Sequence, residues 1–242
     1  MTDPRPSGAT RRLKVLVIDV GGTHVKVLAT GRRTPRTIPS GPSMTAQEMV
    51  SAVKQLTARW RYDVVSMGYP GLVIHGRPVA EPHNLGCGWV GFDFRGAFGC
   101  PLKVINDAAM QALGSYRGGR MLFLGLGTGL GSAMIIDGAL EPMELAHLPY
   151  QKGRTYEDYV GLRGLKRLGT KKWRRHVAAV VRRLTAALEA DDVVIGGGNA
   201  KRVEGLPAGA RSGHHANAFL GGFRLWPKES QRQEKGRVPA SR

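Results

Sequence analysis

The sequence predicts an α/β protein made of two lobes with a cleft between them. Short apolar segments alternate with segments of helical periodicity, and this order divides into two blocks near Asn106. Each block contains a strand, a glycine-rich turn and a second strand. Elements that alternate in this way are typical of layered α/β domains, and 242 residues are enough for one large domain or two small ones.

The first block is predicted to contain four strands and one helix. The helix is indicated because Met49, Val50 and Val53 recur at helical spacing, whereas the strands are short apolar or β-branched runs. The predicted strands are residues 13–18, 25–29, 64–67 and 102–105, and the predicted helix is residues 44–60. The first two strands form a hairpin whose turn contains Gly21 and Gly22.

The second block is predicted to contain three helices and three strands. Its longest helix is indicated by an apolar face of Val177, Val180, Val181 and Leu184. The predicted helices are residues 108–116, 173–189 and 217–226, and the predicted strands are residues 121–124, 133–136 and 193–195. We therefore expect lobes at residues 13–106 and 107–227, a disordered leader at 1–12 and a basic tail at 228–242.

The strongest compositional feature is a net charge of +18, from 36 lysines and arginines against 18 acids. Such an excess favours a polyanionic partner: nucleic acid, an anionic membrane surface or a phosphate-rich substrate. No apolar run approaches the ~20 residues of a membrane span, and no signal peptide is visible, so we expect a cytoplasmic protein without membrane partners. The two cysteines, Cys87 and Cys100, are too few for a disulfide framework.

The first glycine turn has the residue types of a phosphate site. Gly21 and Gly22 would let backbone N–H groups approach an anion, and Thr23 and Lys26 could donate to a phosphate. Asp19 could hold Mg²⁺ through water. The alternative is a tight hairpin turn with a surface lysine.

The second glycine turn spans residues 125–132 and superficially contains G-x-G-x-x-G. A dinucleotide-binding fingerprint must be followed by a helix, whereas residues 132–136 (SAMII) are typical of a strand. The turn therefore predicts a second phosphate clamp between strands, formed by Gly127, Thr128 and Gly129.

The ordered motifs resemble those of the actin/hexokinase-like (ribonuclease H-like) sugar kinases. They are D-x-G-G-T between strands, Asn-Asp at a helix start, G-T-G-x-G-S between strands, and a late strand ending in G-G-G-N. The segment ELAHL at 144–148 further resembles the ROK family, and within it the polyphosphate glucokinases. The resemblance implies two lobes around a central cleft, and it covers about residues 13–226. Family members are often dimers, so a homodimer is a further expectation.

The resemblance assigns roles to individual residues. It implies that Asp107 accepts the proton of a sugar 6-hydroxyl, although a helix N-cap is the structural alternative at the Asn-Asp pair. It implies glucose as the sugar, with mannose or another hexose left open. The residues implied in sugar binding are Asn84, Asn106, Glu144, His147 and Glu157. Gly197 and Gly198 match a loop on the phosphate-donor side. The zinc-binding cysteines of many family members have no counterpart, so the expected metal is Mg²⁺ and no zinc.

Residues 163–183 contain nine bases and no acid. A solvated helix face normally interleaves acids with bases, whereas an uninterrupted basic run suits a linear polyanion. We therefore expect inorganic polyphosphate as donor, with ATP as the alternative. The predicted polyphosphate patch comprises Lys166, Arg167, Lys171, Lys172, Arg174 and Arg175.

Two other classes of function compete with a kinase. A nucleic-acid-binding regulator is disfavoured because only 18 residues precede Asp19 and because basic and aromatic residues are not interleaved. A sugar-sensing regulator without catalysis is disfavoured because Asp19, Asp107 and both glycine turns are present together.

Overall fold

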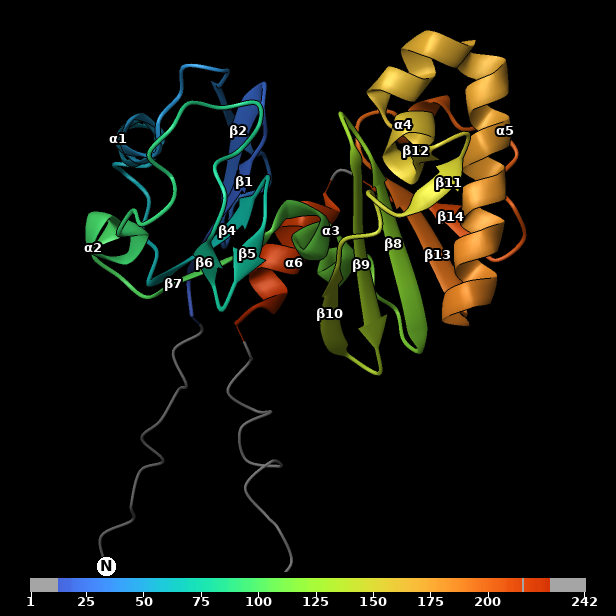
Figure 1. Ribbon diagram of the computed structural model, residues 1–242. Coiled ribbons are helices and arrows are strands. Elements are labelled where there is room, and N and C mark those ends of the chain that lie inside the picture. The colour runs from blue at the N-terminus through green and yellow to red at the C-terminus, as the bar shows by residue number, and fades with distance from the viewer. Residues whose placement is uncertain (1–12, 215, 227–242) are drawn as a thin grey trace, which may run out of the picture.

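A computed structural model describes residues 13–214 and 216–226, and it contains two five-stranded sheets with helices α3 and α6 between them (Figure 1). The predictions for residues 1–12 and 228–242 lie outside the described residues.

The N-terminal sheet has the strand order β3-β2-β1-β4-β7. Strand β1 pairs antiparallel with β2 and parallel with β4, and β4 pairs parallel with β7. The elements of this part of the chain are β1 (Val15–Val20), β2 (His24–Ala29), β3 (Arg36–Pro39), α1 (Ala46–Leu56), β4 (Val64–Tyr69), β5 (Val73–Ile74), β6 (Arg77–Pro78), α2 (Phe94–Phe98) and β7 (Leu102–Asn106).

The alternation of side chains in β1 divides this lobe into two layers. Leu16 and Ile18 belong to a core that also contains residues of α1 and α2. Val15 and Val17 point to the other face, where they pack with residues of α3 and α6. Because strand side chains alternate, Asp19 lies on this second face, toward the other lobe.

The C-terminal sheet has the order β10-β9-β8-β13-β14 and repeats the pairing pattern of the first. Its elements are α3 (Asp107–Ser115), β8 (Arg120–Leu126), β9 (Leu130–Ile136), β10 (Ala139–Met143), β11 (Pro149–Gln151), β12 (Arg154–Thr155), α4 (Tyr156–Val160), α5 (Leu162–Leu188), β13 (Asp192–Gly196), the 3₁₀ turn η1 (Ala200–Arg202), β14 (Ala210–Ser212) and α6 (Asn217–Arg224).

Helices α3 and α6 join the two sheets. Ala108, Ala109 and Ala112 of α3 pack with side chains of β8, β9 and β13, whereas Met110 packs with β1 and β4. Helix α6 returns to the first sheet, where Ser66 of β4 donates to the Gly222 carbonyl at 2.6 Å. The predicted boundary after Asn106 therefore precedes α3, which contacts both sheets, whereas α6 packs on α3 and on the first sheet.

The predicted strands and helices are present, with shifted ends. Helix α5 begins at Leu162, well before the predicted residue 173. The earlier part was not predicted because Gly169, with φ of 70°, kinks the helix and interrupts its apolar periodicity. The short elements α2 and α4 and the strands β3, β5, β6, β10, β11, β12 and β14 were not predicted, because so few residues carry no clear periodicity. Within the described residues no helix is long and apolar enough to cross a membrane.

Candidate active site

Asp107 is the first residue of α3 and directly follows β7. Strand β7 lies beside β4, whose Gly68 leaves room for α3: a Cβ there would overlap the Met110 side chain of that helix. The Ala108 N–H donates to Asp107 Oδ1 at 2.8 Å. The sheet and the helix start thus fix the Asp107 carboxylate at the junction of the lobes.

The Asp107 carboxyl is tuned to titrate near neutrality. Burial raises its pKa, the negative charge of Asp19 raises it further, and the backbone hydrogen bond from Ala108 opposes both, giving a pKa of about 7. A carboxyl with such a pKa can accept a proton at physiological pH without being permanently ionised.

Asn106 is the N-cap of α3, so the helix cap that was the alternative interpretation of the Asn-Asp pair is present. Its Oδ1 accepts from the N–H groups of Ala108 at 2.9 Å and Ala109 at 3.2 Å. Its Nδ2 donates to the Gly71 carbonyl at 3.0 Å, which anchors the G-Y-P-G loop at 68–71. A sugar contact of Asn106 stays a prediction, and it would have to use the second Nδ2 hydrogen.

The first glycine turn is a tight hairpin in which the Gly21 N–H donates to the His24 carbonyl at 3.0 Å. Lys26 of β2 lies directly opposite Asp19 of β1 in the antiparallel register, so both side chains share the face toward α3. Ser40, which the sequence analysis missed, donates from Oγ to the Gly21 carbonyl at 2.6 Å. No local pattern marks Ser40, because it comes from the end of the neighbouring strand.

Asn84 lies against this first turn. A Cβ added to Gly22 would come within 2.8 Å of the Asn84 Cβ, so the glycine allows the two segments to approach. Glu81, also missed from sequence, fixes the loop that carries Asn84 by accepting from the N–H groups of Trp89 at 3.1 Å and Val90 at 3.1 Å.

The second glycine turn is held by two neighbouring segments. The Leu162 N–H at the start of α5 donates to the Thr128 carbonyl at 3.1 Å, and Asn199 Nδ2 donates to the Gly127 carbonyl at 3.0 Å. Gly197 has φ of 84°, and a Cβ there would overlap the Leu126 backbone. The loop containing Gly197 and Gly198 therefore lies against the predicted phosphate clamp.

Glu157 connects the clamp with the ELAHL segment. Its Oε2 accepts from the Leu130 N–H at 3.3 Å, and its own N–H donates to the Ala146 carbonyl at 3.0 Å. Glu144 and His147 lie near each other, with 4.0 Å between Oε1 and Nε2, and both are exposed. The structure thus places Glu157 beside Gly129 and next to the segment that carries Glu144 and His147.

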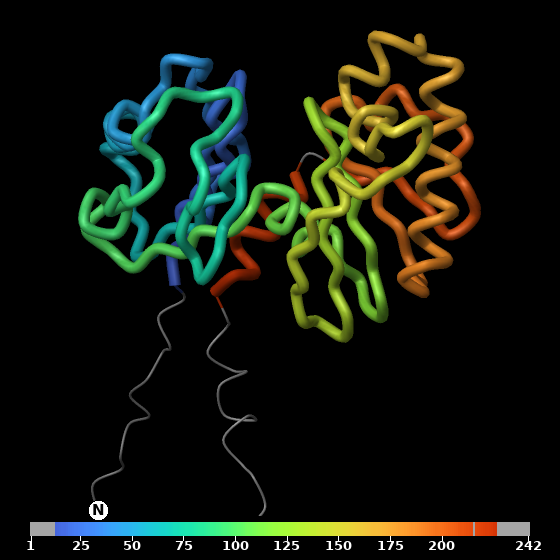
Figure 2. The backbone as a smooth tube through the Cα atoms, viewed as in Figure 1, coloured from blue at the N-terminus to red at the C-terminus, as the bar shows by residue number. Residues whose placement is uncertain are grey.

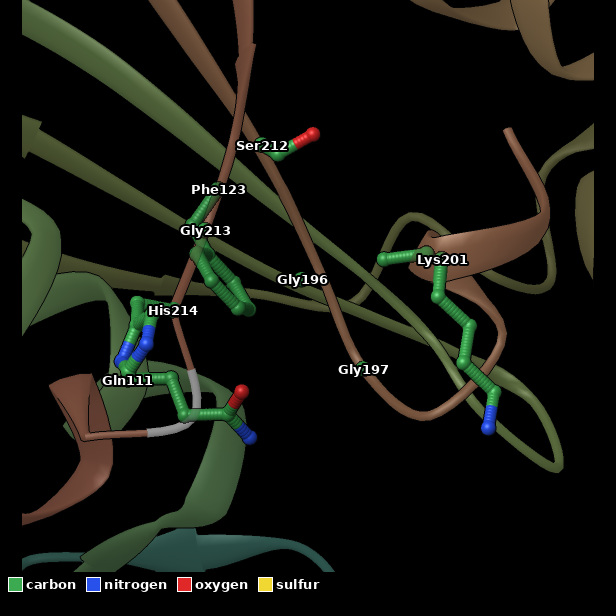
Figure 3. A pocket seen from close by; sticks show the side chains of 9 residues that line it. Gln111, Phe123, Gly196, Gly197, Lys201, Ser212, Gly213 and His214 are labelled. Carbon is green, nitrogen blue, oxygen red and sulfur yellow. The ribbon is translucent and has the colours of Figure 1, made fainter. Parts of the chain in front are cut away.

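A pocket of about 210 Å³ adjoins the Gly196–Gly197 loop (Figure 3). Gln111 of α3 and His214 lie at one side of this pocket, and Lys201 of η1 lies at the other. No sequence pattern marks these polar residues, because they come from three separate segments.

The basic run lies on α5, and most of its bases are exposed. Arg174 of the predicted patch is engaged by the protein itself, since Nη2 donates to Glu204 Oε1 at 2.6 Å. Arg167 donates to the Asp158 carbonyl at 2.7 Å and covers the Tyr159 ring. Arg167 and Arg174 of the predicted patch therefore already have partners within the protein.

Among the described residues, no group of three or more His, Cys, Asp and Glu could hold a metal ion. Asp19 nevertheless lies near the end of β1, just before the first glycine turn, and its negative charge acts on Asp107. Mg²⁺ is typically held by one or two carboxylates together with substrate phosphates and waters. The donor set fits a Mg²⁺ ion that enters with a phosphate substrate.

Two sheets of matching topology, joined by shared helices and each contributing a glycine turn near Asp107, define the actin/hexokinase-like class of sugar kinases. The sequence profile of the ROK family matches residues 15–142, more than half of the chain, and the chain belongs to that family.

Similar proteins support this placement among the ROK-family sugar kinases. The polyphosphate glucokinase of Mycobacterium tuberculosis (strain H37Rv) is 29% identical over 223 residues, which cover 81% of this chain and 82% of that protein. The inorganic polyphosphate/ATP-glucomannokinase of Arthrobacter sp. strain KM shares the fold with a TM-score of 0.71 at 24% identity, covering 88% of this chain and 98% of that one. A ROK glucokinase of Streptomyces griseus, solved with glucose and AMPPNP, has a TM-score of 0.71 at 18% identity, with coverage of 88% and 98%.

Proposed function

We propose that the protein transfers the terminal phosphoryl group of inorganic polyphosphate to the 6-hydroxyl of glucose. The observation that carries this proposal is Asp107, a carboxyl with a pKa of about 7 at the lobe junction near Asp19. The similarity to the mycobacterial polyphosphate glucokinase supports the choice of sugar and donor. A cytoplasmic location is part of the proposal.

Asp107 acts as the general base. The ionised carboxylate takes the proton of the sugar hydroxyl as that oxygen bonds to the terminal phosphorus, and the bond from this phosphorus to its bridging oxygen breaks. The remaining polyphosphate leaves one phosphate shorter. Helix α3 holds Asp107 rigidly, so the sugar hydroxyl must be brought to it.

The two glycine turns and Lys26 bind and orient the phosphates. Backbone N–H groups in such turns can stabilise the charge of the transferred group without rearranging. Asp19 would hold a Mg²⁺ ion through water, and the ion supplies charge neutralisation for the phosphate oxygens when bound. The residue opposite Asp19, Lys26, adds a fixed positive charge on the same face.

Glu144, His147, Glu157 and Asn84 bind the sugar hydroxyls in this proposal. Glu157 also accepts from the Leu130 N–H, so movement of this carboxylate toward a sugar would be felt in the second glycine turn. Closure of the lobes around both substrates would exclude water and suppress hydrolysis of the donor.

A second candidate is an ATP-dependent glucokinase or related hexose kinase. The pocket beside Gly196 and Gly197 favours it, because Gln111, Lys201 and His214 offer polar groups next to the loop on the donor side.

The test is formation of glucose 6-phosphate by purified protein given glucose and Mg²⁺, with polyphosphate or ATP as the only donor. Turnover with polyphosphate at higher kcat/KM than with ATP is the expected result. Turnover only with ATP supports the second candidate, and no product from a folded protein with either donor rejects both. Mannose in place of glucose tests the sugar.

A further inference from the structure

We propose that the outward face of α5 beyond its kink is an anchoring surface for a linear inorganic polyphosphate chain, separate from the cleft in which transfer occurs. This surface, the α5 stripe, consists of Lys171, Arg175 and Arg182, flanked by Lys172 and Arg183. The inference rests on the proposed polyphosphate donor and adds a second place where that donor is held.

The α5 stripe lies on the opposite side of the C-terminal sheet from α3. Trp173 and Val177 of α5 pack in one core with Leu122 of β8, whereas Phe123 of the same strand packs with α3. Helix α5 covers the outer face of the sheet, as the ribbon and tube views show (Figure 1, Figure 2). The stripe therefore cannot line the site around Asp107. The bases of α5 do not form one continuous patch with the cleft.

The bases of the stripe are aligned along the helix. At 3.6 residues per turn, Lys171, Arg175 and Arg182 lie within about 40° around the axis and extend over about 16 Å. All three are exposed. Ala178 is the small residue on this face between Arg175 and Arg182, so an extended chain could lie across the helix surface there.

The positive charges of the stripe repel one another, and helix α5 has no acidic residue to offset them. No Asp or Glu occurs from Leu162 to Leu188, and Lys171 and Arg175 form a like-charge i,i+4 pair. The helix is kept in place by its buried face, where Trp173 Nε1 donates to the Val160 carbonyl at 2.8 Å. Arg174 lies off the stripe and pairs with Glu204. Bound phosphates would relieve the repulsion along the stripe.

The chemistry of the stripe favours polyphosphate over nucleic acid. Proteins that bind single strands without sequence preference place aromatic rings where bases can stack. The stripe itself has no aromatic residue, and the neighbouring Tyr150 ring is already covered by the Arg183 guanidinium at 5.1 Å. A polymer that consists of phosphates alone matches a surface of cations alone.

A path of further bases connects the stripe with the transfer site. Helix α5 starts at Leu162, which donates to Thr128 of the second glycine turn. Arg163 and Lys166 follow within the first turns, before the kink at Gly169, and both are exposed. A short donor occupies the cleft alone, whereas a long chain can extend from the cleft onto the stripe.

The experiment compares K171Q/R175Q/R182Q with a control, R33Q/R61Q/R95Q, that removes the same charge from exposed positions of the N-terminal lobe. For long-chain polyphosphate, we expect about a tenfold higher KM in the stripe variant, because counterion release is lost at three positions. The KM values for tripolyphosphate and glucose should stay within twofold of the parent. The control should keep the parent KM for every substrate. Circular dichroism and thermal melting verify that both variants fold.

Direct binding of long-chain polyphosphate to the intact proteins tests the stripe independently of turnover. If the parent makes no product from polyphosphate, the proposed donor fails, yet weaker binding to the stripe variant than to the control still supports the surface. Equal binding or equal KM in stripe variant and control overturns it. Tighter binding of single-stranded DNA than of polyphosphate, lost in the stripe variant, overturns polyphosphate as the occupant.

Discussion

Asp107 combines two properties at one position, the first residue of α3. The positive end of the helix and the Ala108 N–H favour the carboxylate, while burial and Asp19 favour the neutral acid. The second pair prevails, and the pKa rises from an ordinary 3.8 to about 7. The same residue therefore gains basicity from an arrangement that costs stability.

We predict that Asp19→Asn lowers the pKa of Asp107 while leaving it above 3.8, because burial, the larger cause, remains. The measurement is the titration midpoint of the Asp107 carboxyl by ¹³C NMR in protein without added metal. An unchanged midpoint would show that the two carboxylates are not coupled. Asp137→Asn, at the far end of β9, serves as the control.

Asp107→Asn should abolish most turnover and stabilise the protein. Loss of a general base typically costs about 10²–10⁴-fold in rate. Since the pKa of Asp107 is raised in the folded state, folding is penalised as pH rises from about 4 through about 7. At pH 8 the variant should gain about 1–2 kcal/mol in free energy of unfolding, less than the full shift implies because the side chain keeps some contact with solvent.

Urea denaturation of parent and variant at pH 4 and pH 8 tests this sign. Most of the gain should be lost at pH 4, because Asp107 is then protonated in the folded state and close to its ordinary pKa of 3.8 in the unfolded state. A gain of equal size at both pH values would assign the effect to packing rather than charge.

At the scale of elements, α3 and α6 cross closely because both carry glycine at the contact. A Cβ on Gly114 would overlap the Asn217 carbonyl, and a Cβ on Gly221 would overlap the Met110 carbonyl. The contacting atoms belong to backbones that are fixed by helices, so neither side can move away easily.

Gly221→Ala should therefore destabilise the protein by about 3 kcal/mol or more, although alanine is otherwise the better helix former. Leu220→Ala, on the exposed side of α6, should change stability by no more than about 0.5 kcal/mol. Thermal melting of the two variants gives the comparison. Similar melting temperatures would mean that the helices can separate without loss.

The long elements and both glycine turns could be predicted from sequence because each leaves a local pattern, such as alternation in β1 or the helical face around Val177. The position of Asp107 was predicted for the same reason, since Asn-Asp follows a strand and opens a helix, whereas its role as base was implied by the resemblance to sugar kinases and stays a prediction. Ser40 and Glu81 could not be predicted, because each acts on a segment brought near only by folding. Five-residue α4 was also missed, although its first turn positions Glu157.

At the scale of the whole molecule, the two sheets repeat one topology with unrelated side chains. Strands β1, β2 and β4 correspond in pairing to β8, β9 and β13. No repeat is visible in the sequence, because the topology requires only apolar alternation and a glycine turn, which many sequences satisfy. The two-lobed arrangement was predictable from element order, whereas the position of α5 relative to the cleft was not.

The net charge of +18 acts on any phosphate donor, but donors differ in how many charges they present. A long polyphosphate can contact many bases at once and releases more counterions than ATP, so its binding should weaken more steeply with salt. Between 50 and 200 mM NaCl we expect kcat/KM to fall by about tenfold or more with polyphosphate and by only about two- to threefold with ATP. Steady-state assays at fixed free Mg²⁺ and saturating glucose measure both slopes, with tripolyphosphate replacing ATP if ATP is not used. Parallel slopes would mean that the donor touches few bases outside the glycine turns, and the charge excess would then need another anionic partner.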